Sequence, residues 1–375
     1  MTDSICHSRA SGNPATFGSP IKDFGDDKAY KLCHFDYELP RELIAQTALP
    51  KRSDARLLVL NRKQEKIEHK TFRDVQDYFN KGDVLVLNDT KVLPARIFGK
   101  RKTGARIEIL LLKRVGAIWE ALVKPSGRVR QWEELEVGEK DKVIISVIDP
   151  PNQDSGIRHL KFEDQINADK ILETIGRIPL PPYIDREDTP IDRELYQTVF
   201  AKLPGAVASP TAGLHFDQLL LNQLRAKGVE ILFVTLHVSY GTFQPVANDD
   251  LTQHQMYEEY FEIPDETAEP LNFAKADGRT ITACGTTVVR TLESAATDSL
   301  PSEVEAKQGA TKLFIYPPYE FKIADRMITN FHLPRTTLLM LTSAFAGHDF
   351  LMRAYREAIE KRYRFYSYGD AMLII

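Results

Sequence analysis

The C-terminal half of the chain repeats one pattern: a short apolar strand, a compact polar segment and then a helical period. The pattern occurs in "GAVASPTAGLHFDQLLLNQLRAKG", in "RTITACGTTVVRTLESAA" and in "RMITNFHLPRTTLLMLTSAFAG". In the first copy, Phe216, Leu220 and Leu224 share one helical face, and Gly228 is placed to end the helix. The next strand, "VEILFVTLH", completes a β-loop-α-β unit, so we predict that 205–209 and 229–237 pair in parallel. These repeats indicate an α/β sheet.

Between Val92 and Ile178 the pattern changes to short β-rich runs at hairpin-like spacing, "RIFGK", "ARIEILLLKRV", "AIWEALVKP" and "KVIISVID". They predict a small antiparallel β-barrel. Because helical periods and strands flank it on both sides, we predict a mixed α/β main domain, made of 34–91 and 179–375, with the barrel of 92–178 inserted. The main domain begins with a helix near Pro40 and a strand around "RLLVL". Residues 1–33, rich in Ser, Gly, Pro and Asp, predict a disordered extension.

Composition excludes some classes of protein. The net charge of -4 is small for 375 residues, so whole-chain charge does not identify a partner. Cys6, Cys33 and Cys284 are odd in number and widely spaced, which disfavours a disulfide framework and a structural metal. The N-terminus has no apolar signal-peptide core, and the longest apolar run, "TTLLMLTSAFAG", is too short to span a bilayer. We therefore expect a cytoplasmic protein.

Four polar segments stand between a strand end and a chain reversal: "SPTAGLH" (209–215), "HVSYGTF" (237–243), "CGTTVVR" (284–290) and "NFHLPRTT" (330–337). Any one of them alone is explained by turns and helix caps. Together at the carboxyl edge of one sheet, their helix N-termini would suit a carboxylate or a phosphate. Arg290 either clamps such a carboxylate or forms an ion pair with Glu293.

Three histidines in these segments, His215, His237 and His332, can exchange a proton near neutral pH. "HVSYG" also has the form of a nucleophile elbow with histidine in place of the first glycine, so a serine hydrolase using Ser239 stays open. The chain has no G-x-G-x-x-G motif after a strand and no G-x-x-x-x-G-K-[ST] motif.

Basic residues are concentrated in the predicted barrel. Between Lys91 and Arg130 there are eleven basic and two acidic residues. Such an imbalance in an acidic protein favours a face for phosphate backbones. A solvated basic surface, balanced by the acidic "EELEVGEKD" that follows, explains the composition equally well.

Long and unusual strings in the chain carry a family resemblance: "VLNDTKVLPARIFGK", "IPLPPYIDRED", "LYQTVFAKLPGAVASPTAGLHF", "GTFQPV", "LFIYPPYEFKI", "ITNFHLPRTTLLMLTSAFAG" and "YRFYSYGDAML". From "FDYELPRELIAQ" to the end, the sequence resembles the S-adenosylmethionine:tRNA ribosyltransferase-isomerase family of queuosine biosynthesis. The resemblance implies a mixed α/β fold with an inserted β-barrel.

The resemblance also implies a function. The family transfers and isomerises the ribosyl part of S-adenosylmethionine onto the 7-aminomethyl-7-deazaguanine at the wobble position of tRNA, giving epoxyqueuosine and releasing adenine and methionine. S-adenosylmethionine is then the co-substrate and tRNA the partner, and we expect no metal, membrane or protein partner. A tRNA-binding homologue with altered catalysis and a small-molecule serine hydrolase are the alternatives.

This chemistry suggests roles for the residues of the polar segments. We expect His215 or His237 to act as the base, and His332 or Glu259 to handle leaving-group protons. The start of the "CGTT" helix and Arg290 would hold the methionine carboxylate. The expected S-adenosylmethionine contacts are Thr211, Gly213, Gly241, Thr242, Gly285, Thr286, Thr287 and Arg290, and the expected RNA contacts are Lys100, Arg101, Lys102, Lys124, Arg128 and Arg130.

The chain departs from the family pattern at three places. Ser239-Tyr240 stands where the family has Gly-Ala, Val288 where it has Ser, and Tyr257 where it has a second histidine. Ser-Tyr adds bulk where a backbone could approach the co-substrate, and Val288 removes a hydroxyl. The alternative of altered catalysis depends on these positions.

Overall fold

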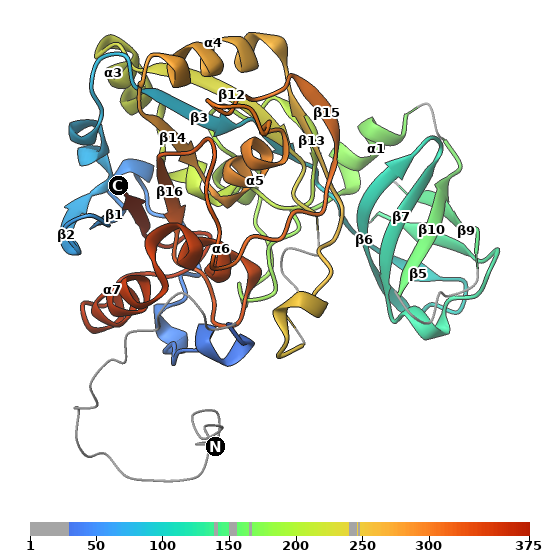
Figure 1. Ribbon diagram of the computed structural model, residues 1–375. Helices are drawn as coiled ribbons and strands as arrows, with labels where there is room; N and C mark the ends of the chain where they lie inside the picture. Colours follow the sequence, from blue (N-terminus) through green and yellow to red (C-terminus); the bar gives the residue numbers. More distant parts are fainter. Residues whose placement is uncertain (1–29, 139–141, 150–155, 165–166, 240–245, 247) are drawn as a thin grey trace, which may run out of the picture.

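The computed structural model describes residues 30–375 except 139–141, 150–155, 165–166, 240–245 and 247. The chain forms a large α/β lobe and a smaller β-barrel lobe beside it (Figure 1). The predicted fold class, a mixed α/β domain with an inserted antiparallel barrel, is confirmed. In the part of the chain that the structure describes, no helix is long and apolar enough to cross a membrane.

One sheet of nine strands, in the order β15-β13-β12-β3-β14-β16-β17-β1-β2, forms the centre of the large lobe. Its middle is parallel, because β3 pairs in parallel with β12 and β14, and β14 with β16. The strand β17 is antiparallel to β16 and parallel to β1. The strands are β1 (Arg56–Asn61), β2 (Lys66–Thr71), β3 (Val84–Asn88), β12 (Glu230–Leu236), β13 (Glu259–Ile263), β14 (Ile281–Cys284), β15 (Lys307–Thr311), β16 (Arg326–Asn330) and β17 (Ala371–Ile374).

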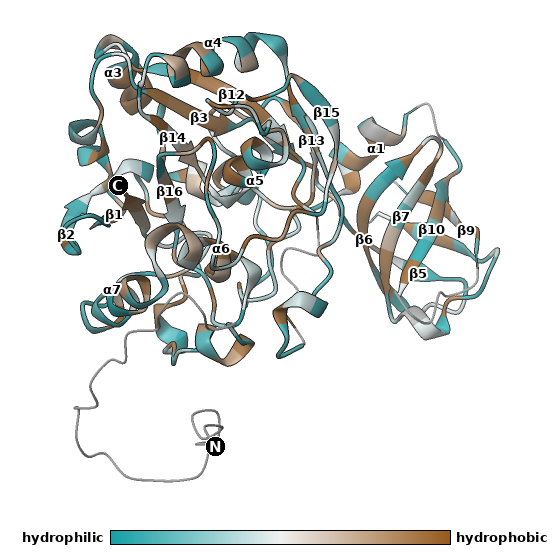
Figure 2. Ribbon diagram, viewed as in Figure 1, coloured by the Kyte–Doolittle hydropathy of each residue, from teal (hydrophilic) through white to brown (hydrophobic). Residues whose placement is uncertain are grey.

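Helices cover both faces of this sheet, which explains the unbroken apolar sequences of its central strands. Every residue of β3 and β14 is buried. One face packs against η4 (Phe72–Tyr78) and α3 (Gln218–Ala226). The other packs against α4 (Asp265–Ala276), α5 (Thr286–Ser294), α6 (Thr337–Ala346) and α7 (His348–Glu360). Figure 2 shows apolar strands between helices such as α4 and α7, which carry hydrophilic residues as well.

One predicted strand pairing is wrong. The strand before "SPTAGLH", β11 (Leu203–Ala206), pairs in parallel with β4 (Thr90–Val92) and not with β12. A strand has two edges, and β3 and β13 occupy both edges of β12. Among the described residues, one backbone hydrogen bond, from Val207 N–H to the Val238 carbonyl (3.1 Å), joins the segments that follow β11 and β12.

The smaller lobe is a closed barrel of six antiparallel strands in the order β10-β7-β6-β5-β8-β9. Its residues alternate between the apolar interior and the surface, as in β7, so each strand is half buried. Leu172 of α1 (Ala168–Ile175) and Val207 of the large lobe pack against its core. The strands are β5 (Arg96–Arg101), β6 (Arg106–Val115), β7 (Ile118–Lys124), β8 (Glu134–Val137), β9 (Val143–Val147) and β10 (Ile157–Phe162).

The remaining helical segments are short. The region near Pro40 forms only the 3-10 turn η2 (Arg41–Leu43), so the helix predicted there is wrong in type. Proline at the N-cap is followed by three helical residues before Ile44 turns back to extended backbone. The others are η1 (Leu32–Phe35), η3 (Arg52–Asp54), η5 (Ser126–Arg128), α2 (Asp192–Leu195), η6 (Thr211–His215) and η8 (Leu251–Gln253).

The packed chain begins before residue 34. Leu32 is fully buried in the core of the large lobe, and its N–H donates to the Asp249 carbonyl (3.1 Å). Disorder was therefore wrongly predicted for 30–33, where one leucine and its backbone bonds suffice to hold the segment; 1–29 lie outside the described residues. Cys33 is disulfide-bonded and Cys284 is a free buried thiol. An odd, dispersed set of cysteines still allows one bridge, which the sequence analysis disfavoured.

Candidate active site

A cavity of about 320 Å³ lies where β14 and β16 end, at the carboxyl edge of the parallel strands. Three of the four polar segments contribute several residues to its wall, and the fourth contributes Val238. The wall consists of Pro182, Tyr183, 208–212, Val238, 285–287, 329–334, Thr336, Leu338, Tyr366 and Ser367. The convergence expected of these segments therefore exists, and its size is that of a small-molecule site.

The helix α5 begins at the cavity wall. Gly285 precedes it with φ of 96°, a conformation that favours glycine, and no side chain caps the helix. The first intrahelical bond runs from Val289 N–H to the Gly285 carbonyl (3.2 Å). The N–H groups of Thr286, Thr287 and Val288 have no partner among the described residues. This helix start is a site for an anionic group.

Two buried polar side chains face the cavity without satisfied hydrogen bonds. Ser209 is 4% exposed and Asn330 is 2% exposed. Neither Ser209 Oγ nor Asn330 Oδ1 has a hydrogen-bond partner among the described residues, whereas Asn330 Nδ2 donates to the Tyr366 carbonyl (2.9 Å). Leaving such atoms unpaired costs about 1–3 kcal/mol each. A polar ligand in the cavity would remove that cost.

Aromatic rings form another part of the wall. Tyr183 and Tyr366 have ring centroids 4.0 Å apart, and Phe331 lines the cavity with them. The Tyr183 hydroxyl is hydrogen-bonded to Ser367 Oγ. Such rings bind flat apolar groups and attract cations. The C-terminal segment thus supplies both Tyr366 and Ser367 to the cavity and β17 to the sheet.

His332 is a histidine of the cavity wall. It is buried, with Nδ1 3.2 Å from Thr342 Oγ1 and Nε2 3.3 Å from Thr329 Oγ1. Burial lowers the pKa of His332 to about 3. The imidazole is therefore neutral near pH 7, and burial makes its protonation unfavourable in the absence of a bound ligand.

His215 does not line this cavity. It lies in a small separate pocket with Arg52 and Tyr368, and its ring packs against Phe72 at 5.0 Å. Burial lowers the pKa of His215 to about 4, while an interaction with Asn330 opposes the shift. Its Nε2 has no partner at hydrogen-bond distance and angle. His215 is thus placed behind Asn330, and its connection to the cavity is indirect.

His237 also lies outside the cavity wall. Its Nδ1 is 2.7 Å from Thr90 Oγ1, and its ring stacks on Tyr260 at 5.6 Å. It covers Gly205 so closely that a Cβ there would lie 2.6 Å from His237 Nε2. Burial lowers the pKa of His237. The base predicted at His215 or His237 is therefore not supported by where the two side chains lie.

Glu259 and Arg290 form a buried ion pair. Glu259 Oε1 also accepts from Ser239 N–H (2.9 Å), and Arg290 Nε donates to the Leu313 carbonyl (3.0 Å). Of the two alternatives for Arg290, the ion pair with Glu293 is not formed: Arg290 pairs with Glu259, and Glu293 accepts from the backbone N–H groups of Lys322 and Ile323. Neither member of the Glu259–Arg290 pair lines the cavity.

The other predicted contacts divide between the cavity and elsewhere. Thr211, Gly285, Thr286 and Thr287 line it. Gly213 does not: a Cβ there would lie 2.8 Å from the Phe200 ring. Gly241 and Thr242 are outside the described residues. The sequence analysis did not single out Tyr183, Ser209, Asn330 or Tyr366, although all four lie in strings that carry the family resemblance.

Two further features bear on chemistry. Ser239 Oγ is buried without a hydrogen-bond partner among the described residues, so no histidine activates it as a nucleophile. Over the described ranges, no group of three or more His, Cys, Asp or Glu side chains is placed to hold a metal ion.

The predicted RNA contacts in the barrel fall into three groups: residues that line a surface groove, residues that form ion pairs, and exposed residues outside the groove. Lys100 and Lys124 line a groove on the barrel surface. Arg101 forms a bidentate pair with Glu133 (2.7 and 3.0 Å), and Lys102 pairs with Glu134 at 2.8 Å. Arg128 and Arg130 are exposed but do not line the groove.

Comparisons with known proteins bear on the whole chain. Residues 32–374 match the family described as "Queuosine biosynthesis protein". The S-adenosylmethionine:tRNA ribosyltransferase-isomerase of Thermotoga maritima is 51% identical over 346 residues, covering 92% of this chain and 100% of that protein. The protein of the same name from Sulfurihydrogenibium sp. is 50% identical over 348 residues, with the same coverage. A crystal structure of the Thermotoga maritima S-adenosylmethionine tRNA ribosyltransferase is similar with a TM-score of 0.52 and 42% identity, covering 91% of this chain and 100% of that one.

Proposed function

Because the chain belongs to the queuosine biosynthesis protein family, we propose that it modifies the 7-aminomethyl-7-deazaguanine at the wobble position of a tRNA anticodon. The enzyme is an S-adenosylmethionine:tRNA ribosyltransferase-isomerase. It transfers and isomerises the ribosyl part of S-adenosylmethionine, and epoxyqueuosine, adenine and methionine are the products. It acts in the cytoplasm, where tRNA and S-adenosylmethionine are both available.

The cavity at the carboxyl edge of the sheet is the observation that carries the proposal. S-adenosylmethionine combines a carboxylate, a sulfonium cation and a flat adenine, and the wall offers a group for each. The unpaired N–H groups of Thr286 and Thr287 would hold the carboxylate. The rings of Tyr183, Phe331 and Tyr366 would face the sulfonium and the adenine.

We assign the proton-accepting role in the cavity to His332. It lines the wall, whereas His215 and His237 do not. Burial lowers the pKa of all three histidines, so position and not pKa separates them. Hydroxyls of Thr329 and Thr342 contact its two ring nitrogens and fix the ring. His215 would act indirectly, by holding Asn330 in place. Glu259 and Arg290 would support the wall rather than touch the co-substrate.

The described residues among the three departures from the family pattern do not line this cavity. Val288 packs in the core with no exposed surface, and Tyr257 is half exposed. Ser239 does not line the cavity, and Tyr240 is outside the described residues. A homologue without catalysis is therefore not favoured. A serine hydrolase is not favoured either, because Ser239 Oγ has no base at hydrogen-bond distance among the residues that the structure describes.

The product of the reaction tests the proposal. The protein is incubated with S-adenosylmethionine and a tRNA that carries the aminomethyl precursor at the wobble position. We expect free adenine, and a nucleoside whose mass increases by the transferred ribosyl group. The same tRNA with an unmodified guanine serves as the control, because it lacks the attacking amine. Adenine release that is equal with both tRNAs, or absent with both, would contradict the proposal.

A further inference from the structure

A hollow on the barrel lies over the outer faces of β5, β6 and β7, with a volume of about 770 Å³. Strand register sets its floor: Glu108 lies opposite Phe98 on one side and Lys124 on the other, and Arg106 lies opposite Lys100. Because adjacent strands lie about 4.8 Å apart, these side chains form two neighbouring rows. We refer to this surface as the barrel groove.

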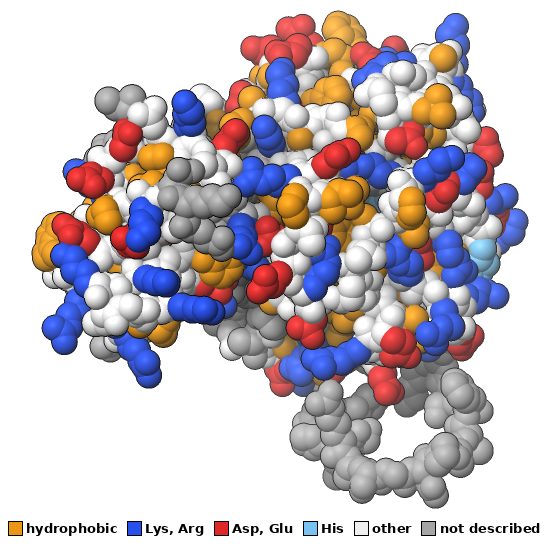
Figure 3. Space-filling model, turned by 180° about the vertical axis from the view of Figure 1, so that it is seen from behind, with side chains coloured by type: hydrophobic (Ala, Val, Ile, Leu, Met, Phe, Trp, Pro, Cys, Tyr) orange, Lys and Arg blue, Asp and Glu red, His pale blue; other side chains and the backbone are white. Residues whose placement is uncertain are grey.

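The barrel groove carries uncompensated positive charge. Its three acids are already paired, Glu108 with Arg96 (3.3 Å), Glu136 with Lys142 (2.8 Å) and Glu187 with Arg177 (3.9 Å). In contrast, Lys100, Arg106 and Lys124 are exposed and form no ion pair within the described part of the chain. Lys and Arg side chains gather over this lobe when the molecule is viewed from behind (Figure 3). Three free cations along a groove suit a chain of phosphates.

An exposed aromatic ring lies among these cations. Phe98 is 38% exposed although it is a large apolar side chain, and it alternates with the buried Ile97 on the same strand. The guanidinium of Arg177 lies over the Phe98 ring, 5.2 Å from its centroid. An aromatic face beside cations is the arrangement on which unpaired bases stack. A double helix would not use it, because its bases are already stacked on one another.

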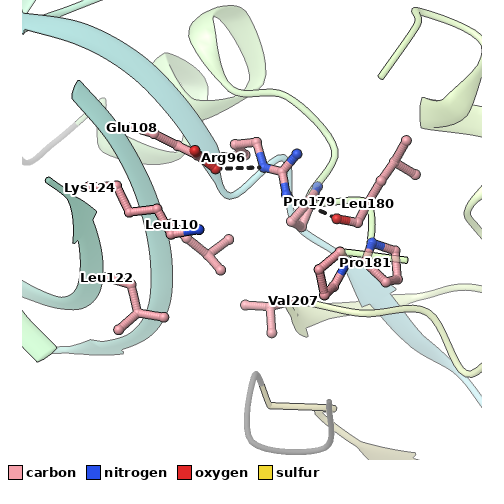
Figure 4. A pocket seen from close by; sticks show the side chains of 10 residues that line it. Arg96, Glu108, Leu110, Leu122, Lys124, Pro179, Leu180, Pro181 and Val207 are labelled. Atoms are coloured by element: carbon pink, nitrogen blue, oxygen red, sulfur yellow. Dashed lines mark hydrogen bonds and ion pairs between the residues drawn. The ribbon is translucent and has the colours of Figure 1, made fainter. Parts of the chain in front are cut away.

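The barrel groove leads to the cavity of the large lobe. Glu108 and Lys124 line both the groove and a narrow cleft between the lobes. In Figure 4 the cleft has Lys124, Glu108 and Leu122 on the barrel side and Pro179, Leu180 and Pro181 on the other. Pro182 lines both this cleft and the cavity. The cleft therefore lies between the barrel groove and the cavity and shares lining residues with each of them.

We propose that the barrel groove binds an unpaired nucleotide of the tRNA anticodon loop that neighbours the wobble nucleotide, with its base stacked on Phe98 and its phosphates at Lys100, Arg106 and Lys124. The proposal rests on the function proposed above, because the wobble nucleotide must enter the cavity. It commits to single-stranded RNA on two grounds: charge complementarity and the aromatic face.

The test measures binding of an anticodon stem-loop RNA to the full chain. We expect Phe98→Ala to weaken binding about tenfold and Phe98→Trp to preserve it, since stacking tolerates any large aromatic ring. Abasic substitution of the loop nucleotides beside the wobble position should weaken binding to the wild type. The abasic RNA should bind the wild type and Phe98→Ala with equal affinity, because it has no base to stack on the ring. The matched control is Trp132→Ala, an exposed barrel aromatic outside the barrel groove.

A second arm tests the cations. Removing Lys100, Arg106 and Lys124 together should lower the slope of log Kd against log salt by about 2 for single-stranded phosphates. The control removes three exposed lysines of the same barrel that do not line the groove, Lys102, Lys113 and Lys161. Equal slopes in the two triple variants would overturn the proposal. So would tighter binding of the stem duplex alone than of the stem-loop, or unchanged binding by Phe98→Ala.

These results are separable from the proposed reaction. Stem-loop binding is measured without S-adenosylmethionine, so it does not depend on turnover. If the wild type releases no adenine yet binds the stem-loop through Phe98, the reaction proposal fails and the groove proposal stands. If Phe98→Ala binds and turns over like the wild type, the groove proposal fails alone.

Discussion

The cavity and the barrel groove recognise different parts of a substrate by different physical means. The cavity is walled by neutral groups: a helix start, the buried Ser209 and Asn330, aromatic rings and an uncharged His332. The barrel groove is open and holds three unpaired cations. Interactions in the buried cavity are short-ranged and weakly screened, whereas those of the groove are screened by salt. Variants of the cavity should therefore affect chemistry and stability, and variants of the groove should affect salt-dependent binding.

The largest expected effect is on catalysis at His332. Removing a proton-accepting side chain lowers turnover by about a thousandfold, so we expect His332→Ala to release adenine about that much more slowly. Binding of tRNA should be unchanged, because His332 is buried and does not line the barrel groove. Adenine release by His215→Ala and His237→Ala should fall much less. If His237→Ala releases adenine more slowly than His332→Ala, the assignment is wrong and His237 is the base.

The next effect concerns two ion pairs, one in each lobe. Breaking the buried Glu259–Arg290 pair by Glu259→Gln should lower the free energy of unfolding by about 3–5 kcal/mol, because a buried charge loses its partner. The pair Lys102–Glu134 is exposed, with side chains 72% and 52% accessible. Glu134→Gln should therefore change the free energy of unfolding by less than about 1 kcal/mol. Urea unfolding measures both. A similar small change in both variants would show that Arg290 is not held by Glu259.

Acid should destabilise the large lobe through its buried histidines. The pKa values of His215 and His332 are lowered from 6.5 to about 4 and about 3. The unfolded chain therefore binds more protons below pH 6.5, and the stabilisation, complete above that pH, is lost as the pH falls toward 4. Two such groups give the free energy of unfolding a slope against pH that approaches about 3 kcal/mol per pH unit. His215→Gln should reduce this slope by about half. An unchanged slope would show that His215 is already protonated in the folded state.

The smallest effect compares two lysines of the barrel that are two positions apart. Lys100 is unpaired in the groove, whereas the charge of Lys102 is offset by Glu134. We expect Lys100→Glu to weaken tRNA binding several-fold and to reduce its salt slope by about 1. Lys102→Glu should have less than half this effect, and neither should alter the affinity for S-adenosylmethionine. Equal losses in both variants would locate the RNA on the whole barrel surface rather than in the groove.

The barrel was predictable because most of its pairings are local. Four of its six pairings join consecutive strands, and alternation in runs such as 106–115 identifies the buried face. The pairings of β5 with β8 and of β7 with β10, which close the barrel, are not local. The pairing of β12 was not predictable in the same way, because its neighbour β3 comes from the N-terminal part of the main domain. Local patterns predict a strand but do not choose between distant partners.

The sequence identified most of the segments that form the site, but not which of their side chains face the cavity. Polar segments after parallel strands of one sheet meet at one edge, which accounts for Gly285–Thr287. Thr211 also lines the cavity, although the strand before it, β11, pairs with β4 outside that sheet. Which way a histidine points out of a turn depends on packing: Phe72 holds His215 outside the cavity, and Thr90 and Tyr260 hold His237. The partner of Arg290 was missed because Glu259 lies 31 positions away on another strand.

The place of β17 in the sheet has a consequence for folding kinetics. The strand β1 reaches the rest of the sheet only through β17, and Arg56 N–H donates to Asp370 Oδ1 from 314 positions away (2.9 Å). Contacts between such remote segments form slowly, because the whole intervening loop must close first. Tyr366 and Ser367, which wall the cavity, directly precede this strand. During refolding, the capacity to bind S-adenosylmethionine should therefore appear last, well after the barrel has formed.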